Sequence, residues 1–246
     1  MTLPLKPIYL LADSQLLFWK EEGRCFLDSV RGQIERRFPK AAYVGASNGD
    51  DPAFYSIFEA AMEGVGIDEC RMIPASLSTE DALFVEDADL ILLAGGDVMR
   101  GWEAFEESGL KEQIVRRYYE GAVLVGVSAG AVQLGLFGWP GDGLSPDNLS
   151  SLFRLVPFII SAHDESGGWE ELKSAVHLTG GRFPGIGIPF GGGAVYHPER
   201  SLEPVRYALH EFSLKDEQVV AGLLCPAPPP AAPARAGEDP AAQPFD

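Results

Sequence analysis

The amino-acid sequence predicts an α/β fold of three layers, in which helices cover both faces of a doubly wound, mostly parallel sheet. Strand-like and helix-like patterns alternate along most of the 246 residues, as they do in chains of βα units with right-handed crossovers. Apolar runs such as 90–94 are continuous, which indicates strands buried on both faces. A hydrophobic fraction of 46% and a charged fraction of 22% are ordinary for a globular protein.

The expected elements follow from these patterns in chain order. Strands are expected at 7–12, 42–46, 69–73, 89–94, 122–127, 158–162 and 185–189, with a late pair near 193–197 and 219–224. Helices are expected at about 21–38, 52–66, 79–85, 102–120, 129–136 and 169–178. The stretch 137–151 is rich in Gly, Pro, Asp and Ser and predicts a long loop.

A change of composition near residue 225 sets the expected domain organisation. No internal repeat or boundary interrupts residues 1–225, so we expect a single α/β domain there. Residues 226–246 are rich in proline and alanine, which is typical of an extended, disordered tail.

The net charge of −17 argues against nucleic acid and anionic membranes as partners, since both require clustered Lys and Arg. The apolar runs are too short to cross a membrane, and the N-terminus lacks a secretory pattern. Three widely spaced cysteines fit a reducing cytoplasm, where we expect the protein. No histidine pair has the spacing of a metal site, so we expect no metal and no cofactor.

The most informative segment is Gly126-Val127-Ser128-Ala129-Gly130. A buried strand ends there, a helix begins, and one serine stands at the apex of a turn too tight for large side chains. Such a turn exposes the serine hydroxyl beside the N–H groups of a helix N-terminus. These groups can stabilise the oxyanion that forms when a carbonyl is attacked. The segment therefore predicts Ser128 as the nucleophile of an acyl transfer, although small residues here can also serve packing alone.

A second glycine turn follows the preceding strand. Gly95, Gly96 and Asp97 stand at its carboxyl end, where glycines let the backbone approach a substrate and present free N–H groups. If the two strands are neighbours, Gly95 or Gly96 supplies one oxyanion donor and the N–H of Ala129 the other. The simpler interpretation is an ordinary turn in which Asp97 caps the next helix.

His163 is the expected base for the serine. It directly follows the apolar run 156–162, which puts it at the carboxyl edge of the sheet with Ser128. His177 lies near a helix end, His197 precedes a proline in a turn, and His210 lies in an amphipathic segment.

Together these features resemble the serine peptidases of the dipeptidase E (aspartyl dipeptidase) and cyanophycinase family. The similarity runs in order from about residue 40 to 196, and its most specific part is the Gly-x-Ser-Ala-Gly-Ala turn. It implies a class I glutamine-amidotransferase-like (flavodoxin-like) fold and cleavage of peptide or isopeptide bonds, often beside aspartate. By position it implies Ser128 as nucleophile, His163 as base, and Gly96 and Ala129 as oxyanion donors.

The chain departs from this family in two places. Phe190 stands where dipeptidase E-like members carry a glutamate, so the acid behind the histidine must come from elsewhere. Cyanophycinase-like members draw it from between serine and histidine, where Asp142 is our first choice and Asp147 the second. Further candidates are Asp164, Glu165 and Glu199.

The second departure concerns substrate preference. Family members that bind an acidic residue carry arginine soon after the histidine, whereas 164–171 here is acidic and lacks it. Aspartate specificity then requires Arg100, Arg154 or Arg182 to reach the site.

The sequence leaves three functions open. The first is a serine peptidase that hydrolyses short peptides through an acyl-enzyme. The second is a catalytically inactive member that acts as a binding or regulatory module, which the missing glutamate supports. The third is an α/β-hydrolase-type esterase with His197 or His210 as its late histidine. A small substrate site in this fold can be completed by a second subunit, which leaves a homodimer open.

Overall fold

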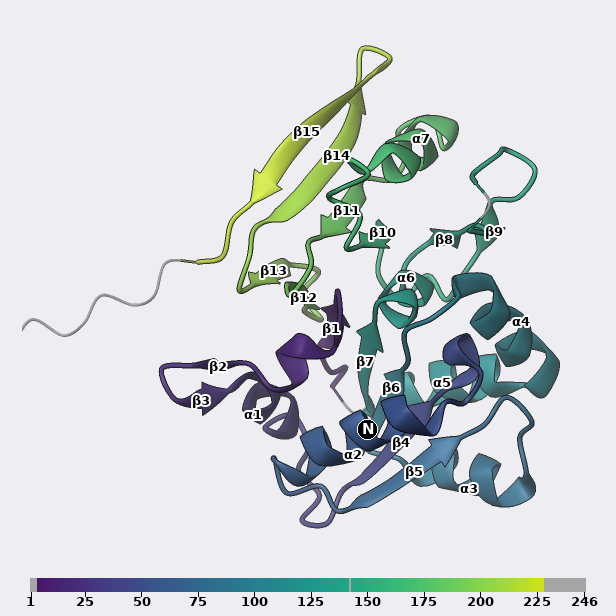
Figure 1. The fold of residues 1–246 in the computed structure, drawn as a ribbon, viewed down its shortest axis with the longest axis vertical. Helices are drawn as coiled ribbons and strands as arrows, with labels where there is room; N and C mark the ends of the chain where they lie inside the picture. The colour runs from purple at the N-terminus through teal and green to yellow at the C-terminus, as the bar shows by residue number, and fades with distance from the viewer. Residues whose placement is uncertain (1–3, 142, 228–246) are drawn as a thin grey trace, which may run out of the picture.

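A seven-stranded mixed sheet forms the centre of the molecule in the computed structural model, which describes residues 4–141 and 143–227 (Figure 1). Five neighbouring strands are parallel, and two antiparallel strands extend one edge. In spatial order the strands are β13 (Leu202–Val205), β12 (Gly193–Tyr196), β1 (Ile8–Leu11), β7 (Val123–Val127), β6 (Leu90–Leu93), β4 (Lys40–Val44) and β5 (Glu69–Ile73).

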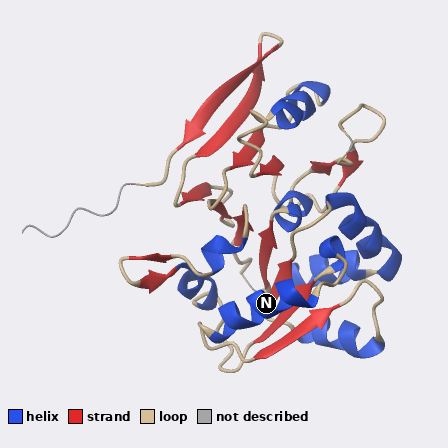
Figure 2. Cartoon of the chain, viewed as in Figure 1, coloured by secondary structure: helices blue, strands red, loops and turns tan. Residues whose placement is uncertain are grey.

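Helices cover both faces of this sheet, so the chain has the expected three layers (Figure 2). The strands β1, β6 and β7 are buried at every residue, which explains why their sequences are continuously apolar. One face packs against the 3-10 helix η1 (Ser14–Leu17), α1 (Phe26–Arg31) and α2 (Pro52–Glu63). The other packs against α3 (Thr79–Asp87), α4 (Val98–Ser108), α5 (Leu110–Tyr119) and α6 (Ala129–Leu134).

A second sheet of four strands follows in the chain. Its order is β10 (Ile159–Ala162), β11 (Gly185–Ile188), β14 (Leu209–Lys215) and β15 (Gln218–Leu224), and α7 (Glu170–Leu178) packs on it. Ile160 and Ile186 of this sheet belong to the same core cluster as Ile8 and Leu10 of the central sheet. The two sheets therefore share one core, with β10 lying against α6.

Several expected elements differ from the structure. The helix expected at 21–38 is wrong at both ends, because β2 (Lys20–Glu21) and β3 (Arg24–Cys25) form a hairpin before α1, and α1 ends at Arg31. The helix expected at 102–120 is two helices, α4 and α5, since Gly109 adopts a φ of 75° between them. The expected loop at 137–151 is bounded by a small ribbon of β8 (Phe137–Gly138) and β9 (Ser150–Ser151).

The strands expected at 158–162 and 185–189 are present, but they belong to the second sheet rather than to one doubly wound sheet. Most of the tail expected at 226–246 lies outside the described residues. Among the helices that the structure describes, none is long and apolar enough to cross a membrane.

Candidate active site

The turn between β7 and α6 holds Ser128 in an unusual backbone conformation. Its φ is 51° and its ψ is −110°, which a residue other than glycine rarely adopts. Its N–H donates to the Leu11 carbonyl on β1 at 2.8 Å, and its own carbonyl accepts from the N–H groups of Ala131 and Val132. The strand and the first turn of the helix therefore fix the serine from both sides, and its side chain points out of the turn.

Two glycines make this turn sterically possible. A Cβ on Gly126 would lie 2.5 Å from the Gly130 carbonyl oxygen and 2.6 Å from the Ala131 nitrogen. A Cβ on Gly130 would lie 2.7 Å from the Leu93 carbonyl carbon on β6. The first glycine thus lets the chain fold back on itself, and the second lets α6 pack directly on β6.

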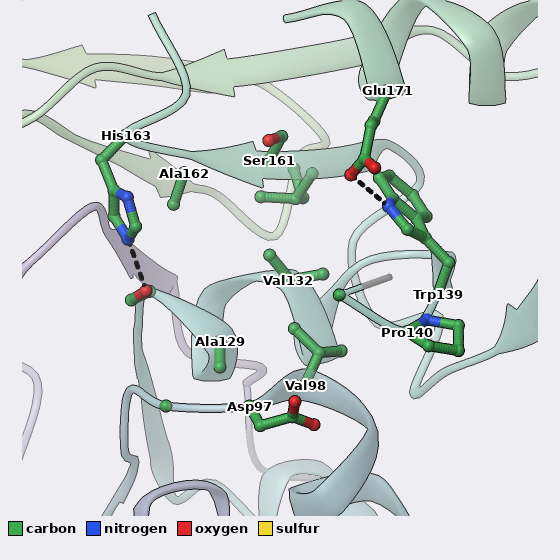
Figure 3. A pocket seen from close by; sticks show the side chains of 14 residues that line it. Asp97, Val98, Ala129, Val132, Trp139, Pro140, Ser161, Ala162, His163 and Glu171 are labelled. Carbon is green, nitrogen blue, oxygen red and sulfur yellow. Dashed lines mark hydrogen bonds between the residues drawn. The ribbon is translucent and has the colours of Figure 1, made fainter. Parts of the chain in front are cut away.

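Ser128 and His163 lie in hydrogen-bonding contact. The distance from Ser128 Oγ to His163 Nε2 is 2.7 Å, and the pair is open to solvent (Figure 3). His163 follows β10 with a φ of 47°, and its N–H donates to the Ile188 carbonyl on β11 at 2.8 Å. The expectation that one sheet edge carries both residues is corrected here: His163 comes from the four-stranded sheet, which packs against α6.

The glycine turn after β6 lies beside the serine. A Cβ on Gly95 would lie 3.3 Å from the Ser128 Cβ, so this backbone borders the serine. Gly96 has a φ of 136°, and a Cβ there would lie 2.8 Å from the Asn48 nitrogen. The turn therefore packs against the 3-10 helix η2 (Ala46–Asn48), a fit that only glycine allows.

Asp97 and Ala129 stand at the N-termini of the two helices that meet at the site, Asp97 as the N-cap before α4 and Ala129 as the first residue of α6. The Asp97 carboxylate accepts a hydrogen bond from the Arg100 N–H at 2.8 Å and so caps α4. This is the capping role that an ordinary turn between strand and helix predicts for Asp97. Ala129 is the buried first residue of α6. Both border a cavity that contains the Ser128 and His163 side chains.

The acid behind His163 stays a prediction. Asp142 lies outside the described residues, and the described part of the chain offers no carboxylate that hydrogen-bonds with His163 Nδ1. The Glu165 carboxylate accepts the Phe190 N–H at 3.0 Å instead. Burial, with repulsion from Glu171 and Glu165, raises the pKa of the Asp164 carboxyl. The described pair is therefore a Ser–His dyad.

The other histidines lie away from the serine. His197 forms a contact of 2.8 Å with Glu203 and borders a separate pocket. His210, on β14, packs against Trp169 with ring centroids 5.4 Å apart. The α/β-hydrolase interpretation, which needs one of these two as base, has no support in this geometry.

Two cavities meet at the dyad, and Gly96, Ser128 and His163 border both. The first has a volume of about 240 Å³ and extends past Val132 and Trp139 to Glu171. The second, of about 470 Å³, opens on the other side. It is bordered by Asp13, Asn48, Phe54, Glu165, Ser166 and Phe190 among others. Arg100, Arg154 and Arg182 border neither cavity.

Gln133 is a supporting residue that the sequence analysis missed. It is fully buried on α6, and its amide nitrogen donates to the Ser47 hydroxyl at 3.1 Å and to the Val98 carbonyl at 2.9 Å. It thereby joins α6 to η2 and α4, the elements around the glycine turn. The sequence feature that could have revealed Gln133 is a polar residue within a very short apolar helix, since a buried polar group needs hydrogen-bond partners.

The fold and this site define an α/β protein that presents a Ser–His pair of the kind serine hydrolases use. Residues 7–189 match the family model described as Peptidase family S51, and the chain belongs to this family, which contains peptidase E and cyanophycinase. This is the family that the sequence motifs around Ser128 resemble.

Solved structures with the same fold are similar to the chain over most of its length. The crystal structure of a peptidase from an acI-B1 Actinobacterium has a TM-score of 0.62 and 17% identity, and the match covers 89% of this chain and 97% of that one. A candidate peptidase E protein from Listeria monocytogenes EGD-e has a TM-score of 0.54 and 15% identity, covering 89% and 99%. No curated protein gives a significant match.

Proposed function

We propose that this protein is a serine peptidase that hydrolyses short peptides through an acyl-enzyme. Ser128 Oγ attacks the peptide carbonyl carbon while its proton passes to His163 Nε2. The C–N bond then breaks as that proton moves to the leaving amine. A water molecule, activated by His163, releases the acyl group from Ser128.

The backbone around Ser128 suits the charge that forms on the carbonyl oxygen. The N–H of Ala129 opens α6, where the helix dipole favours negative charge, and the N–H of Gly96 belongs to the turn beside the serine. We assign both as the oxyanion donors. Asp142 remains our prediction for the acid that orients His163.

The 2.7 Å contact between Ser128 and His163, at the junction of two cavities, is the observation that carries this proposal. A peptide bond placed there has a cavity for the acyl side and another for the leaving side. Membership of a peptidase family supports peptides as the substrate class.

Labelling with a fluorophosphonate probe tests the nucleophile. We expect covalent labelling of the wild-type chain that disappears in Ser128→Ala and falls strongly in His163→Ala. Ser174→Ala removes an exposed helix serine whose hydroxyl only bonds the Glu170 carbonyl, so it is the matched control and should be labelled like the wild type. Mass spectrometry of a short-peptide mixture measures hydrolysis directly. The variants that lose labelling should also lose this hydrolysis.

A catalytically inactive binding module is the second candidate. The observation in its favour is that no described carboxylate bonds His163 Nδ1, with Phe190 at the position where the family's glutamate is expected. Absence of labelling at every pH, together with peptide binding by the wild type, would favour the module over the enzyme.

Two further parts of the proposal concern the protein's setting. We propose a homodimer, which sedimentation analysis would test, and a cytoplasmic location, which cell fractionation would test. The observation that supports this location is that the chain has three cysteines, widely spaced in its sequence.

A further inference from the structure

The smaller cavity at the dyad has a chemically distinct far end. It begins at Ser128 and His163, passes the apolar side chains of Val98 and Val132, and ends at Glu171 on α7 (Figure 3). Ile160 also borders it. Its volume of about 240 Å³ is below the range for drug-sized ligands and suits one amino-acid side chain. The cavity thus leads from Ser128, along the side chains of Val98 and Val132, to a carboxylate.

Glu171 is held in place without a cationic partner. The Trp139 indole N–H donates to its Oε2 at 2.7 Å, which fixes the carboxylate at the cavity's end (Figure 3). In the described part of the chain no Lys or Arg forms an ion pair with it, whereas its neighbour Glu170 pairs with Lys173 at 2.8 Å. The charge of Glu171 is therefore available to a ligand.

The surroundings reinforce this negative charge. Among the residues that the structure describes, Asp97 is the second acidic one on the cavity, and none of the lining residues is Lys or Arg. Asp164 directly follows His163, and burial together with the nearby charges of Glu171 and Glu165 raises the pKa of its carboxyl. Among the charges that affect this pKa, only that of His163 lowers it. An acidic substrate side chain would meet repulsion here, and a cation would be attracted.

We propose that this cavity selects a positively charged group of the substrate, which lies on Glu171 while its aliphatic stem packs along Val98 and Val132. The group is a lysine or arginine side chain or the free amino terminus of a short peptide. The inference rests on the function proposed above, because the other end of the cavity is the nucleophile. Glu171 is thus a specificity-determining residue that plays no part in bond cleavage.

Matched peptides test the preference in the active enzyme. Dipeptides and tripeptides carry lysine, norleucine or aspartate at each position in turn, with free and acetylated amino termini. Norleucine keeps the stem of lysine without the ammonium group. We expect kcat/KM to favour lysine over norleucine about five- to tenfold if the side chain binds, as for a partly exposed, charge-assisted contact. If the free amino terminus of the peptide binds instead, acetylating it should lower kcat/KM by the same five- to tenfold.

The variant Glu171→Gln separates charge from shape, since its amide oxygen can still accept the Trp139 N–H. We expect it to lose the five- to tenfold preference, whichever group is responsible. Glu170→Gln, one residue earlier on α7 and outside the cavity, is the matched control and should keep the wild-type preference.

Calorimetric binding of the same peptides to full-length Ser128→Ala makes the test independent of turnover. We expect the cationic peptides to bind about five- to tenfold more tightly, and the double variant with Glu171→Gln to bind all peptides alike. Equal binding of cationic and neutral peptides, or a preference that survives Glu171→Gln, would overturn the inference. A charge preference in binding without any hydrolysis or labelling would instead refute the proposed function alone.

Discussion

The close approach of α6 to β6 makes Gly130→Ala the most informative single change at this site. The added Cβ would lie 2.7 Å from the Leu93 carbonyl carbon and 2.8 Å from the Leu93 Cβ. Carbon atoms in contact are normally at least about 3.5 Å apart, and the Leu93 carbonyl oxygen would lie closer still, so the helix and strand must separate by at least about 0.8 Å. Leu93 leads into the Gly95–Gly96 turn, while Gly130 lies two residues after Ser128. The separation therefore moves the Gly96 N–H, one of the two oxyanion donors proposed above, away from Ser128, whereas the Ala129 N–H stays beside the serine.

The expected magnitudes follow from this displacement. Overpacking costs about 1–3 kcal/mol, and alanine in place of a helical glycine returns up to about 1 kcal/mol. The net loss of about 1–2 kcal/mol should lower Tm by about 2–8 °C in a chain of this size. A misplacement of 1 Å can cost about 10²-fold in rate, so we expect kcat/KM to fall by about 10- to 100-fold.

Calorimetric Tm and the rate of fluorophosphonate labelling measure both effects in one preparation. Gly64→Ala is the matched control, because Gly64 ends α2 with a right-handed φ of −58° and lies outside both cavities of the dyad. It should change Tm by less than about 2 °C and leave the labelling rate as in the wild type. If Gly130→Ala kept the wild-type Tm and labelling rate, the packing explanation of the glycine would be wrong.

Three further predictions concern other parts of the chain. His197→Ala should keep kcat/KM within about twofold, whereas His163→Ala should lower it by at least about 10³-fold; the opposite ranking would revive the α/β-hydrolase interpretation. Burial raises the pKa of the Cys70 thiol to about 11 from 9.0, so at pH 8 iodoacetamide should modify it about 100-fold more slowly than an ordinary thiol, with the exposed Cys225 as internal reference in peptide mapping. Hydrogen bonds from an arginine and a lysine lower the pKa of the Asp87 carboxyl in the folded state, so its stabilisation is present above about pH 4 and is lost as the pH falls below that value. Asp87→Asn should therefore lower the free energy of unfolding at pH 7 by less than about 1 kcal/mol and change little at pH 2.5; an equal loss at both pH values in urea titrations would contradict this.

The parts of the fold that the sequence predicts are those where burial alone determines the pattern. Strands such as β6 and β7 are buried on both faces, so their apolar runs leave no other interpretation. The glycines around Ser128 are equally informative, because each permits a close approach that a Cβ would block. The family and the residues 128 and 163 could therefore be found without coordinates.

Long-range pairing is what the sequence does not encode locally. Nothing in the run 158–162 distinguishes a strand of the central sheet from an edge strand of the second sheet that pairs with β11. The break at Gly109 is hidden for a related reason, since a glycine inside an amphipathic pattern is compatible with both a continuous helix and a left-handed corner. The Trp139–Glu171 contact joins residues 32 apart through tertiary packing, which periodicity cannot reveal.

Because the dyad is divided between two sheets, we expect the Ser–His contact to be lost before the protein unfolds completely. The central sheet carries the serine, the four-stranded sheet carries the histidine, and α6 contacts both. Neither sheet alone holds a reactive pair, so a partly opened state that retains a native central sheet is already inert. On gentle heating, fluorophosphonate labelling should then be lost before the helical circular dichroism signal. Labelling of Ser128 would thus measure whether the two sheets are packed together.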